Sequence, residues 1–403
     1  MARRKSGAGG CLLAIVLIAA LCIGVAFATG ALTHFQYVSS GAEERGAEAI
    51  DHDLQATVEA ELQDRYIAYS QLDEEQRRCY RIMYDALRTR EERAFPADGE
   101  EMLNFIRSCV VADHPELFYV EGVRLSTTYN SLTELVSDAK VDGAYYLDAD
   151  ESARRQALID SVVSGFLATV PQDAGDYEKA KLAYDYIVRA TSYDHAGARS
   201  LDWYDGSERA PGQTMDDVFL DGEAVCAGYS AAYQYLLQHM GIRCVQVRGV
   251  ANGTGHAWCI AQLDGEYYHI DPTWGDPQFV DGGYGVPDDY VNYDFLAVTD
   301  GDIAATHVMD NPFELPRCSA MADNYYVREG LLFDWADAER LGRLVADAEA
   351  DGSAAVQVRC SNDEAYRGLL DGVVSSGDLG YSLSDLEYRY AYDDAMRTIT
   401  ILP

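Results

Sequence analysis

Positive charge is scarce in this chain of 403 residues. It has 31 Lys and Arg residues against 67 Asp and Glu residues, so the formal net charge is −36. Such a charge repels DNA, RNA and anionic lipid, because binding to these polyanions depends on neutralising their phosphates. The composition therefore argues against a nucleic-acid partner. A hydrophobic content of 48% and 29 tyrosines indicate packed cores rather than disorder.

The sequence also lacks the usual metal-binding motifs. It has no close-spaced ligand pairs of the structural-zinc type and no D-x-D-x-D-G calcium loop. A zinc site built from Cys226, Cys244, Cys259 and His256 is an alternative that this spacing argues against. We therefore expect neither a metal nor another cofactor.

Negative charge is missing from the start of the chain, where no Asp or Glu precedes Glu43. The basic segment MARRK is followed by an uncharged apolar run of 18 residues, Cys11–Ala28. As a helix this run spans about 27 Å, close to the thickness of the bilayer's hydrocarbon core. Positive charge before it predicts a membrane anchor with the body outside the cytoplasm. The sequence Ala26-Phe27-Ala28 also fits a signal-peptidase site, so a cleaved signal peptide and a secreted protein are the alternative.

Composition and periodicity divide the chain into five parts. An anchor or signal peptide at 1–29 precedes an acidic stalk or linker at 30–60. Apolar residues at three- and four-residue spacing predict a helical N-terminal domain at 61–174. The domain at 175–320 combines an apolar helix with three strand-like runs, and a small α+β domain follows at 321–403. We therefore predict an α+β protein with a helical N-terminal region.

Cys226 stands at the start of a predicted helix. The segment Cys226–Met240 has apolar residues on its buried side and ends at Gly241, a residue type typical of helix C-termini. A helix N-terminus carries about half a positive charge, which favours a thiolate. Seven cysteines lie outside the apolar run, and because this number is odd, an exported body must keep at least one free thiol or pair a cysteine between chains.

A hairpin is predicted around Asp264-Gly265, because this dipeptide is typical of two-residue turns. With these two residues as the loop, Leu263 lies opposite Glu266. Side chains then alternate between the two faces of the hairpin along each strand.

This register places an imidazole and a carboxylate, two groups that could activate the Cys226 thiol, on one face of the hairpin. His256 and Asp271 become diagonal neighbours, roughly 7 Å apart at the backbone and within reach of an imidazole–carboxylate hydrogen bond. Trp258 shares that face, and Cys259 points to the other one. His269 also shares the face of Asp271, so it is the alternative base.

Three segments resemble the transglutaminase-like superfamily, a branch of the papain-like cysteine enzymes: GEAVCAGYSAAYQYLLQHMGIRC, GHAW and EYYHIDPTWGDP. The resemblance covers about residues 175–320, and His307 lies in a segment similar to the one that closes such domains. It implies a papain/transglutaminase-like core in which a cysteine-bearing helix packs on an antiparallel sheet. It also implies that Cys226 is the nucleophile, that His256 is the general base and acid, and that Asp271 orients His256.

Other residues of the expected site would bind the oxyanion that forms when a thiolate attacks a carbonyl, or would line the site. The oxyanion needs hydrogen-bond donors, for which the backbone N–H of Cys226 and the amide of Gln213 are the candidates. Trp258 and Trp274 are expected to line the site, chiefly as packing residues. Cys259 departs from the family pattern, where asparagine usually follows His-Ala-Trp.

The resemblance implies acyl transfer through a thioester on protein or peptide amides, completed by water or by a lysine amine. We expect hydrolysis rather than cross-linking, because the chain shows no calcium switch and no evident amine-donor site. The alternative is a catalytically idle cell-surface module that uses the same fold to bind or to act as a scaffold. Expected partners are a protein or peptide substrate and cell-envelope components.

Overall fold

The computed structural model describes seven stretches of the chain: 65–95, 99–129, 136–200, 210–276, 290–353, 355–379 and 388–402. The predicted anchor or signal peptide and the acidic stalk lie outside these stretches. Within them, every helix is too short or too polar to span a bilayer. The anchor, the signal peptide and the extracytoplasmic location therefore stay predictions.

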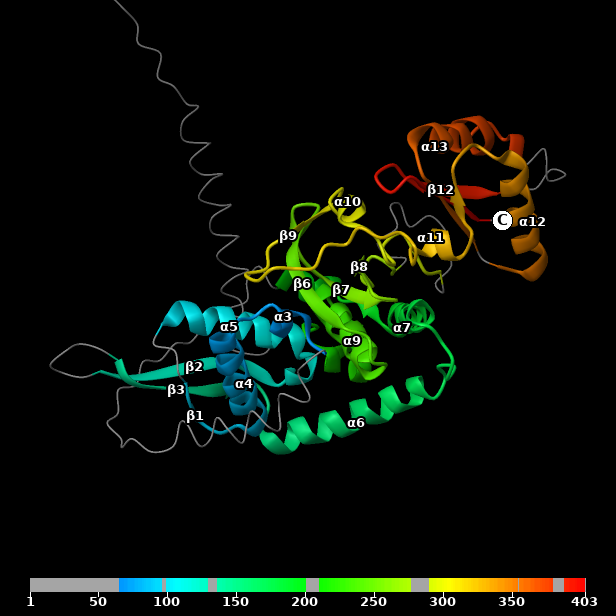
Figure 1. The fold of residues 1–403 in the computed structure, drawn as a ribbon. Coiled ribbons are helices and arrows are strands. Elements are labelled where there is room, and N and C mark those ends of the chain that lie inside the picture. Colours follow the sequence, from blue (N-terminus) through cyan, green and yellow to red (C-terminus); the bar gives the residue numbers. More distant parts are fainter. Residues whose placement is uncertain are drawn as a thin grey trace, which may run out of the picture.

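The N-terminal region combines helices with a small antiparallel sheet (Figure 1). Its elements are α3 (Ile67–Ser70), α4 (Glu74–Thr89), β1 (Arg93–Ala94), α5 (Glu100–Asp113), the 3₁₀ turn η1 (Pro115–Leu117), β2 (Val120–Tyr129), β3 (Val136–Tyr145) and α6 (Ala149–Leu167). Asp73 and Gln76 start α4 with a reciprocal capping box, at 2.9 and 3.0 Å. The predicted helices are present, whereas helical periodicity gave no sign of the sheet, whose order is β1-β3-β2.

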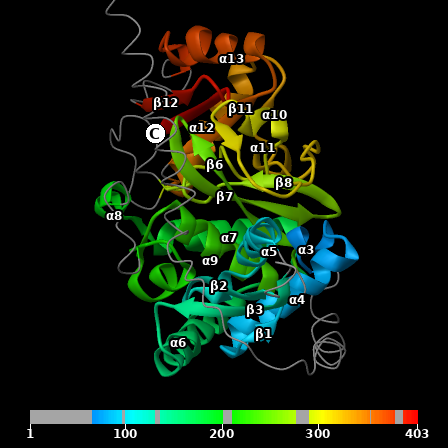
Figure 2. The same ribbon diagram turned by 90° about the vertical axis from the view of Figure 1, so that its left-hand side faces the viewer.

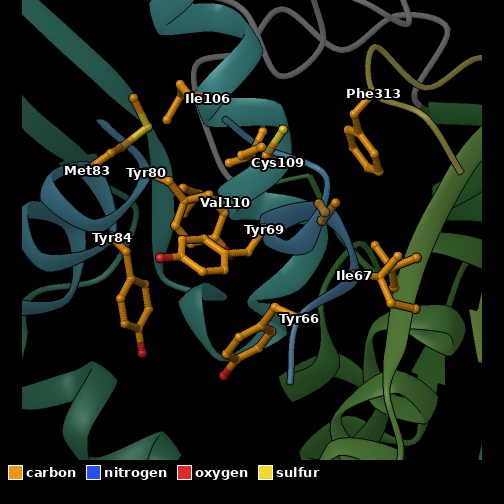
Figure 3. Packing of buried hydrophobic residues seen from close by; sticks show 14 of the residues in the cluster. Tyr66, Ile67, Tyr69, Tyr80, Met83, Tyr84, Ile106, Cys109, Val110 and Phe313 are labelled. Carbon is orange, nitrogen blue, oxygen red and sulfur yellow. The ribbon is translucent and has the colours of Figure 1, made fainter. Parts of the chain in front are cut away.

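Aromatic side chains fill the core beside this sheet (Figure 3). The rings of Tyr69 and Tyr80 meet edge to face, with centroids 5.0 Å apart. Buried Asp113 accepts hydrogen bonds from the Tyr69 backbone and from the Tyr80 hydroxyl, at 2.8 and 2.9 Å. Val247 and Trp258 of the central sheet belong to the same buried cluster. The N-terminal region therefore packs directly against the sheet that carries the candidate site.

The central part has a cysteine-led helix on an antiparallel sheet, as expected for a papain/transglutaminase-like core (Figure 2). Its elements are α7 (Asp176–Ala190), β4 (Ser192–Tyr193), α8 (His195–Ser200), the π-helical turn η3 (Asp217–Asp221), β5 (Glu223–Ala224), α9 (Cys226–His239), β6 (Cys244–Ala251), β7 (Thr254–Leu263), β8 (Glu266–Ile270), α10 (Asp300–Ile303) and β9 (His307–Met309). The sheet order is β8-β7-β6-β9, and β4 pairs with β5 in a separate parallel pair.

The predicted hairpin register is confirmed. Leu263 pairs with Glu266, and the two residues between them have left-handed φ angles, 49° at Asp264 and 90° at Gly265. Positive φ at both positions is the requirement of the tight turn that favours Asp-Gly. The register that follows from this turn fixes which side chains of β7 and β8 share a face.

The C-terminal part has its own sheet and core, drawn in orange and red in Figure 1. Its elements are α11 (Tyr325–Arg328), β10 (Leu332–Phe333), α12 (Ala338–Asp351), β11 (Val356–Cys360), α13 (Asp363–Leu369), the π-helical turn η5 (Leu370–Val374), β12 (Arg389–Asp393) and β13 (Thr398–Leu402). The sheet order is β10-β11-β13-β12. The chain is thus an α+β protein, while the exact borders predicted for its domains stay predictions.

Candidate active site

Cys226 is the first residue of α9, the position that the sequence predicts for it. The extended residue before it, Val225, is held by its backbone N–H, which donates to the Gly212 carbonyl at 2.9 Å. The described part of the chain contains seven cysteines, all free, and Cys226 alone among them is not buried. Its thiol therefore sits at the positive end of a helix with access to solvent.

Asp271 is fully buried directly after β8 and lies against His256, as the diagonal register predicts. The Nε2 atom of His256 and Oδ2 of Asp271 are 2.7 Å apart. A carboxylate only accepts hydrogen bonds, so Nε2 carries the proton and donates it. The other oxygen of Asp271 accepts from the backbone N–H groups of Thr273 and Trp274, at 2.9 and 3.4 Å. These bonds fix the carboxylate and, through it, the imidazole ring.

Cys226 lies close enough to His256 to change the pKa of its ring. Burial disfavours the charged ring, but Asp271 and Cys226 outweigh it through their charges and hydrogen bonds and raise the pKa of His256 to about 10. At Asp271, the contacts with His256 and then with His307 outweigh burial and hold the pKa of its carboxyl well below the usual range. The charged form of the His256 ring is therefore favoured beside the sulfur.

His307 shares the Asp271 carboxylate, a contact that the sequence did not predict. Its Nε2 atom lies 3.2 Å from Oδ2 of Asp271, and its Nδ1 lies 2.7 Å from the Thr306 hydroxyl. Its ring also contacts Trp274, with centroids 4.6 Å apart. The sequence places His307 only in the closing segment, because a three-residue strand far along the chain carries no periodic signal.

His269, the alternative base, has both ring nitrogens engaged elsewhere. The indole N–H of Trp258 donates to Nδ1 at 3.1 Å, and Nε2 lies 3.1 Å from Oδ1 of Asp300. Indole only donates and carboxylate only accepts, so the ring proton is on Nε2. Burial lowers the pKa of His269 to about 4, which keeps the ring neutral. This histidine therefore positions Trp258, and neither nitrogen is left for a thiol.

Trp258 and Trp274 both lie beside the His256 ring. The Trp258 ring lies nearly parallel to the His256 ring, with centroids 6.0 Å apart and an interplanar angle of 20°. The centroid of Trp274 lies 5.9 Å from that of His256. Trp258 is buried and Trp274 only partly so, so Trp258 packs beneath the imidazole while Trp274 has some solvent access.

Gln213 lies in the loop that packs against the start of α9. Gly228 is so close to this loop that an added Cβ would lie 2.5 Å from the Gly212 carbonyl and 3.2 Å from the Thr214 carbonyl. Gln213 stands between those two residues. Its buried amide nitrogen has no hydrogen-bond partner among the described residues. The loop that carries this unsatisfied donor lies against the first turn of α9, and the role of Gln213 at an oxyanion stays a prediction.

Cys259 points away from His256, as the register predicts. It pairs with Gln246 across the sheet, and its thiol donates to the Ser230 carbonyl of α9 at 3.3 Å. Burial, followed by the interaction with Cys244, holds the pKa of Cys259 well above the usual range. The zinc set of the sequence analysis is therefore split between two faces of the sheet.

Two groups of side chains in the described stretches have potential ligand atoms within 4.8 Å of one another. They are His256 with Asp271 and His307, and His269 with Asp300 and Cys318. In both groups the histidine nitrogens that face the carboxylate carry protons, as the hydrogen bonds above require. Both clusters are satisfied as hydrogen-bond networks, and the expectation of no cofactor stays a prediction.

The chain is similar to proteins of one superfamily. Residues 166–272 match the model of the transglutaminase-like superfamily. Kyphoscoliosis peptidase of Mus musculus is 26% identical over 142 residues, which are 32% of this chain and 20% of that protein. The Homo sapiens protein of the same name is 27% identical over 130 residues, 29% of this chain and 18% of the relative. The match thus spans about a fifth of the curated relatives.

Two solved structures show weaker likeness. A TGase is 19% identical with a TM-score of 0.28, covering 37% of this chain and 45% of that one. The periplasmic domain of TgpA from Pseudomonas aeruginosa is 17% identical with a TM-score of 0.21, covering 35% and 57%. At these TM-scores neither likeness bears on function. The family model itself covers the segment that carries Cys226, His256 and Asp271, so this part of the chain matches the transglutaminase-like superfamily.

Proposed function

We propose that this protein is an extracytoplasmic cysteine enzyme that hydrolyses protein or peptide amides through a thioester at Cys226. One observation carries the proposal: a solvent-accessible thiol at a helix N-terminus meets an imidazolium that a buried carboxylate holds in place. These are the parts that nucleophilic catalysis by a thiol requires. The relatives in mouse and human are named peptidases, which supports hydrolysis over cross-linking.

The first half of the reaction forms the thioester. The Cys226 thiolate attacks the carbonyl carbon of the substrate amide. The carbonyl oxygen becomes an oxyanion, which accepts hydrogen bonds from the Cys226 backbone N–H and the Gln213 amide. The His256 imidazolium then gives its proton to the amide nitrogen, the C–N bond breaks, and the amine leaves. Asp271 keeps the ring oriented with Nε2 toward itself, so Nδ1 serves the sulfur and the leaving group.

The second half releases the acid. Neutral His256 now takes a proton from water, whose oxygen attacks the thioester carbonyl. The tetrahedral intermediate collapses, the C–S bond breaks, and the carboxylic acid departs, leaving the Cys226 thiolate and the His256 imidazolium. An amine in place of water would give a cross-link by the same steps.

The extracytoplasmic location is part of the proposal and rests on the basic start and the apolar run Cys11–Ala28. Either an uncleaved anchor or a cleaved signal peptide would deliver the same body. Cell-envelope proteins or peptides are then the substrates within reach.

Mass spectrometry of a peptide mixture incubated with the purified chain, with and without a primary amine, tests the reaction. We expect shortened peptides that Cys226→Ala fails to produce. Without chain cleavage, deamidated glutamines would show that the enzyme deamidates, and amine adducts would show that it cross-links. If the folded protein leaves the peptide mixture unchanged, the proposal of enzymatic activity is wrong and a binding module is favoured.

A further inference from the structure

Arg248 lies between the two elements that carry the nucleophile and the base. On β6 it pairs with Ala257 of β7, the residue after His256. It shares a face with Gln246, because alternate residues of a strand point the same way. The Gln246 amide donates to the Ala227 carbonyl and the Ser230 hydroxyl in the first turn of α9, at 3.1 and 2.9 Å.

The direction of the strand places Arg248 near the sulfur. Residue Gln234, in the middle of α9, bonds to the carbonyl of Cys244 at the start of β6, whereas Gln246 reaches the first turn of the helix. The helix and the strand are thus antiparallel, and Arg248, two residues further along β6, lies at the Cys226 end. Electrostatic interaction between Arg248 and Cys226 agrees with this placement.

The Arg248 guanidinium is available to a ligand. Its side chain is exposed, although desolvation lowers the pKa of its guanidinium, and among the described residues it forms no ion pair with a carboxylate. Its Nε atom makes one long hydrogen bond, 3.5 Å, to the side-chain oxygen of Gln246. Arg107 of α5, a helix that contacts β6, adds a second positive charge close enough to interact with Arg248. Two neighbouring arginines are notable in a chain whose net charge is −36.

We propose that Arg248, assisted by Arg107, binds a carboxylate of the substrate beside the amide that Cys226 attacks, so that the enzyme selects acidic peptides. A guanidinium presents paired N–H donors that match a carboxylate, which makes arginine well suited to this recognition. The surrounding negative charge of the protein would otherwise disfavour such peptides. This inference rests on the proposed function, because it assumes that the substrate is bound at Cys226.

Alkylation of Cys226 by two small reagents tests the inference without a known substrate. Iodoacetate and iodoacetamide differ only in a carboxylate and a carboxamide, and peptide mass mapping measures the rate at Cys226 for each. We expect the ratio of the iodoacetate rate to the iodoacetamide rate to fall about tenfold or more in Arg248→Gln. Arg248→Lys should keep part of the ratio. The control is Arg243→Gln, whose side chain bonds to the Tyr267 hydroxyl away from the site and which should leave the ratio unchanged.

The outcomes separate this inference from the proposed function. An equal fall in both rates in Arg248→Gln would mean that the arginine acts on the thiolate alone, and it would overturn carboxylate binding while leaving the nucleophile intact. A wild-type Cys226 that neither reagent labels faster than the buried thiols would overturn the proposed function itself. Peptides that differ by Glu or Gln next to the scissile amide give the second measurement. The preference for Glu should appear in KM and be reduced in Arg248→Gln, and a wild type without that preference would contradict the inference.

Discussion

At the scale of single residues, the Asp271 carboxylate organises the site. It accepts hydrogen bonds from two histidines, His256 and His307, and from two backbone N–H groups that follow it in the chain. Each donor stabilises the charged form of the carboxyl group, which is why a fully buried aspartate stays ionised. The negative charge in turn keeps the neighbouring imidazole protonated.

Asp271→Asn should therefore lower the pKa of His256 from about 10 toward or below the ordinary histidine value, because it removes the charge that stabilises the imidazolium. The thiolate loses its cationic partner, and alkylation of Cys226 near pH 7 should slow by roughly 10²-fold or more. Ring-nitrogen NMR titration and alkylation kinetics measure the two effects. Exposed Asp310→Asn is the matched control, and a His256 that titrates alike in both variants would rule out the carboxylate as the cause.

His269 should behave in the opposite way to His256. Its folded pKa of about 4 lies below the unfolded value of about 6.5, so the unfolded chain binds the proton first as the pH falls. Stability from this residue is present above about pH 6.5 and is lost as the pH falls toward 4. In urea unfolding, the wild type should exceed His269→Gln in free energy of unfolding by about 2 to 3 kcal/mol less at pH 4.5 than at pH 7. Parallel pH curves would contradict this assignment.

At the scale of elements, the sequence predicts best what local chemistry determines. Asp264-Gly265 dictates a two-residue turn, the turn dictates the register, and the register places His256 beside Asp271. The helix at Cys226 was equally readable from its apolar side and its terminal glycine. These features depend on residues close together in the chain, so a pattern suffices to find them.

Other elements could not be predicted, for physical reasons. Strands β2 and β3 alternate in burial and carry many polar residues, so a search for helical spacing overlooks them. His307 reaches Asp271 only because β9 pairs with the end of β6, a contact between residues more than fifty positions apart. Arg248 lies near Cys226 only because β6 runs antiparallel to α9, and no local sequence pattern encodes that direction.

Gly228→Ala tests how closely the Gln213 loop supports the start of α9. The added methyl group would meet the Gly212 carbonyl and the Ala224 side chain at 2.5 and 2.8 Å, so the loop must move. We expect a loss of about 1–3 kcal/mol in stability, together with slower peptide hydrolysis. Gly165→Ala in α6 is the control, because a Cβ there meets nothing within 4 Å. It should gain about 0.5–1 kcal/mol; equal thermal shifts in the two variants would contradict the tight contact.

At the scale of the whole molecule, the C-terminal sheet is linked to the site by hydrogen bonds. Gln357 of β11 donates to the Asn292 side chain at 2.6 Å and to the Tyr290 hydroxyl at 2.8 Å. Asn292 in turn donates from its side chain to the Trp274 carbonyl at 3.2 Å and from its backbone to the Gly275 carbonyl at 2.9 Å. The segment after Asp271 is therefore held from the far side by the last part of the chain.

Gln357→Ala should weaken this link, because it leaves buried partners without hydrogen bonds. The expected cost is about 1–3 kcal/mol in unfolding free energy, with a smaller fall in the alkylation rate of Cys226 as the Trp274 segment loosens. Chemical denaturation and alkylation kinetics measure both. The exposed pair of Arg343 and Glu339 serves as the control, and Arg343→Ala should cost less than about 1 kcal/mol. A Gln357→Ala protein as stable as that control would show that the two parts fold independently.

The interwoven cores also bear on how this protein can be divided for study. A fragment cut at 166 and 272 would retain Cys226, His256 and Asp271, yet it would lose β9 and the tyrosine-rich helices that share a buried cluster with Trp258. The uncovered face of the sheet would then meet water, and such surfaces drive aggregation. Recombinant work on the reaction should therefore keep at least residues 65–402, because Met396 belongs to the same buried cluster and Gln357 helps to hold the segment after Asp271.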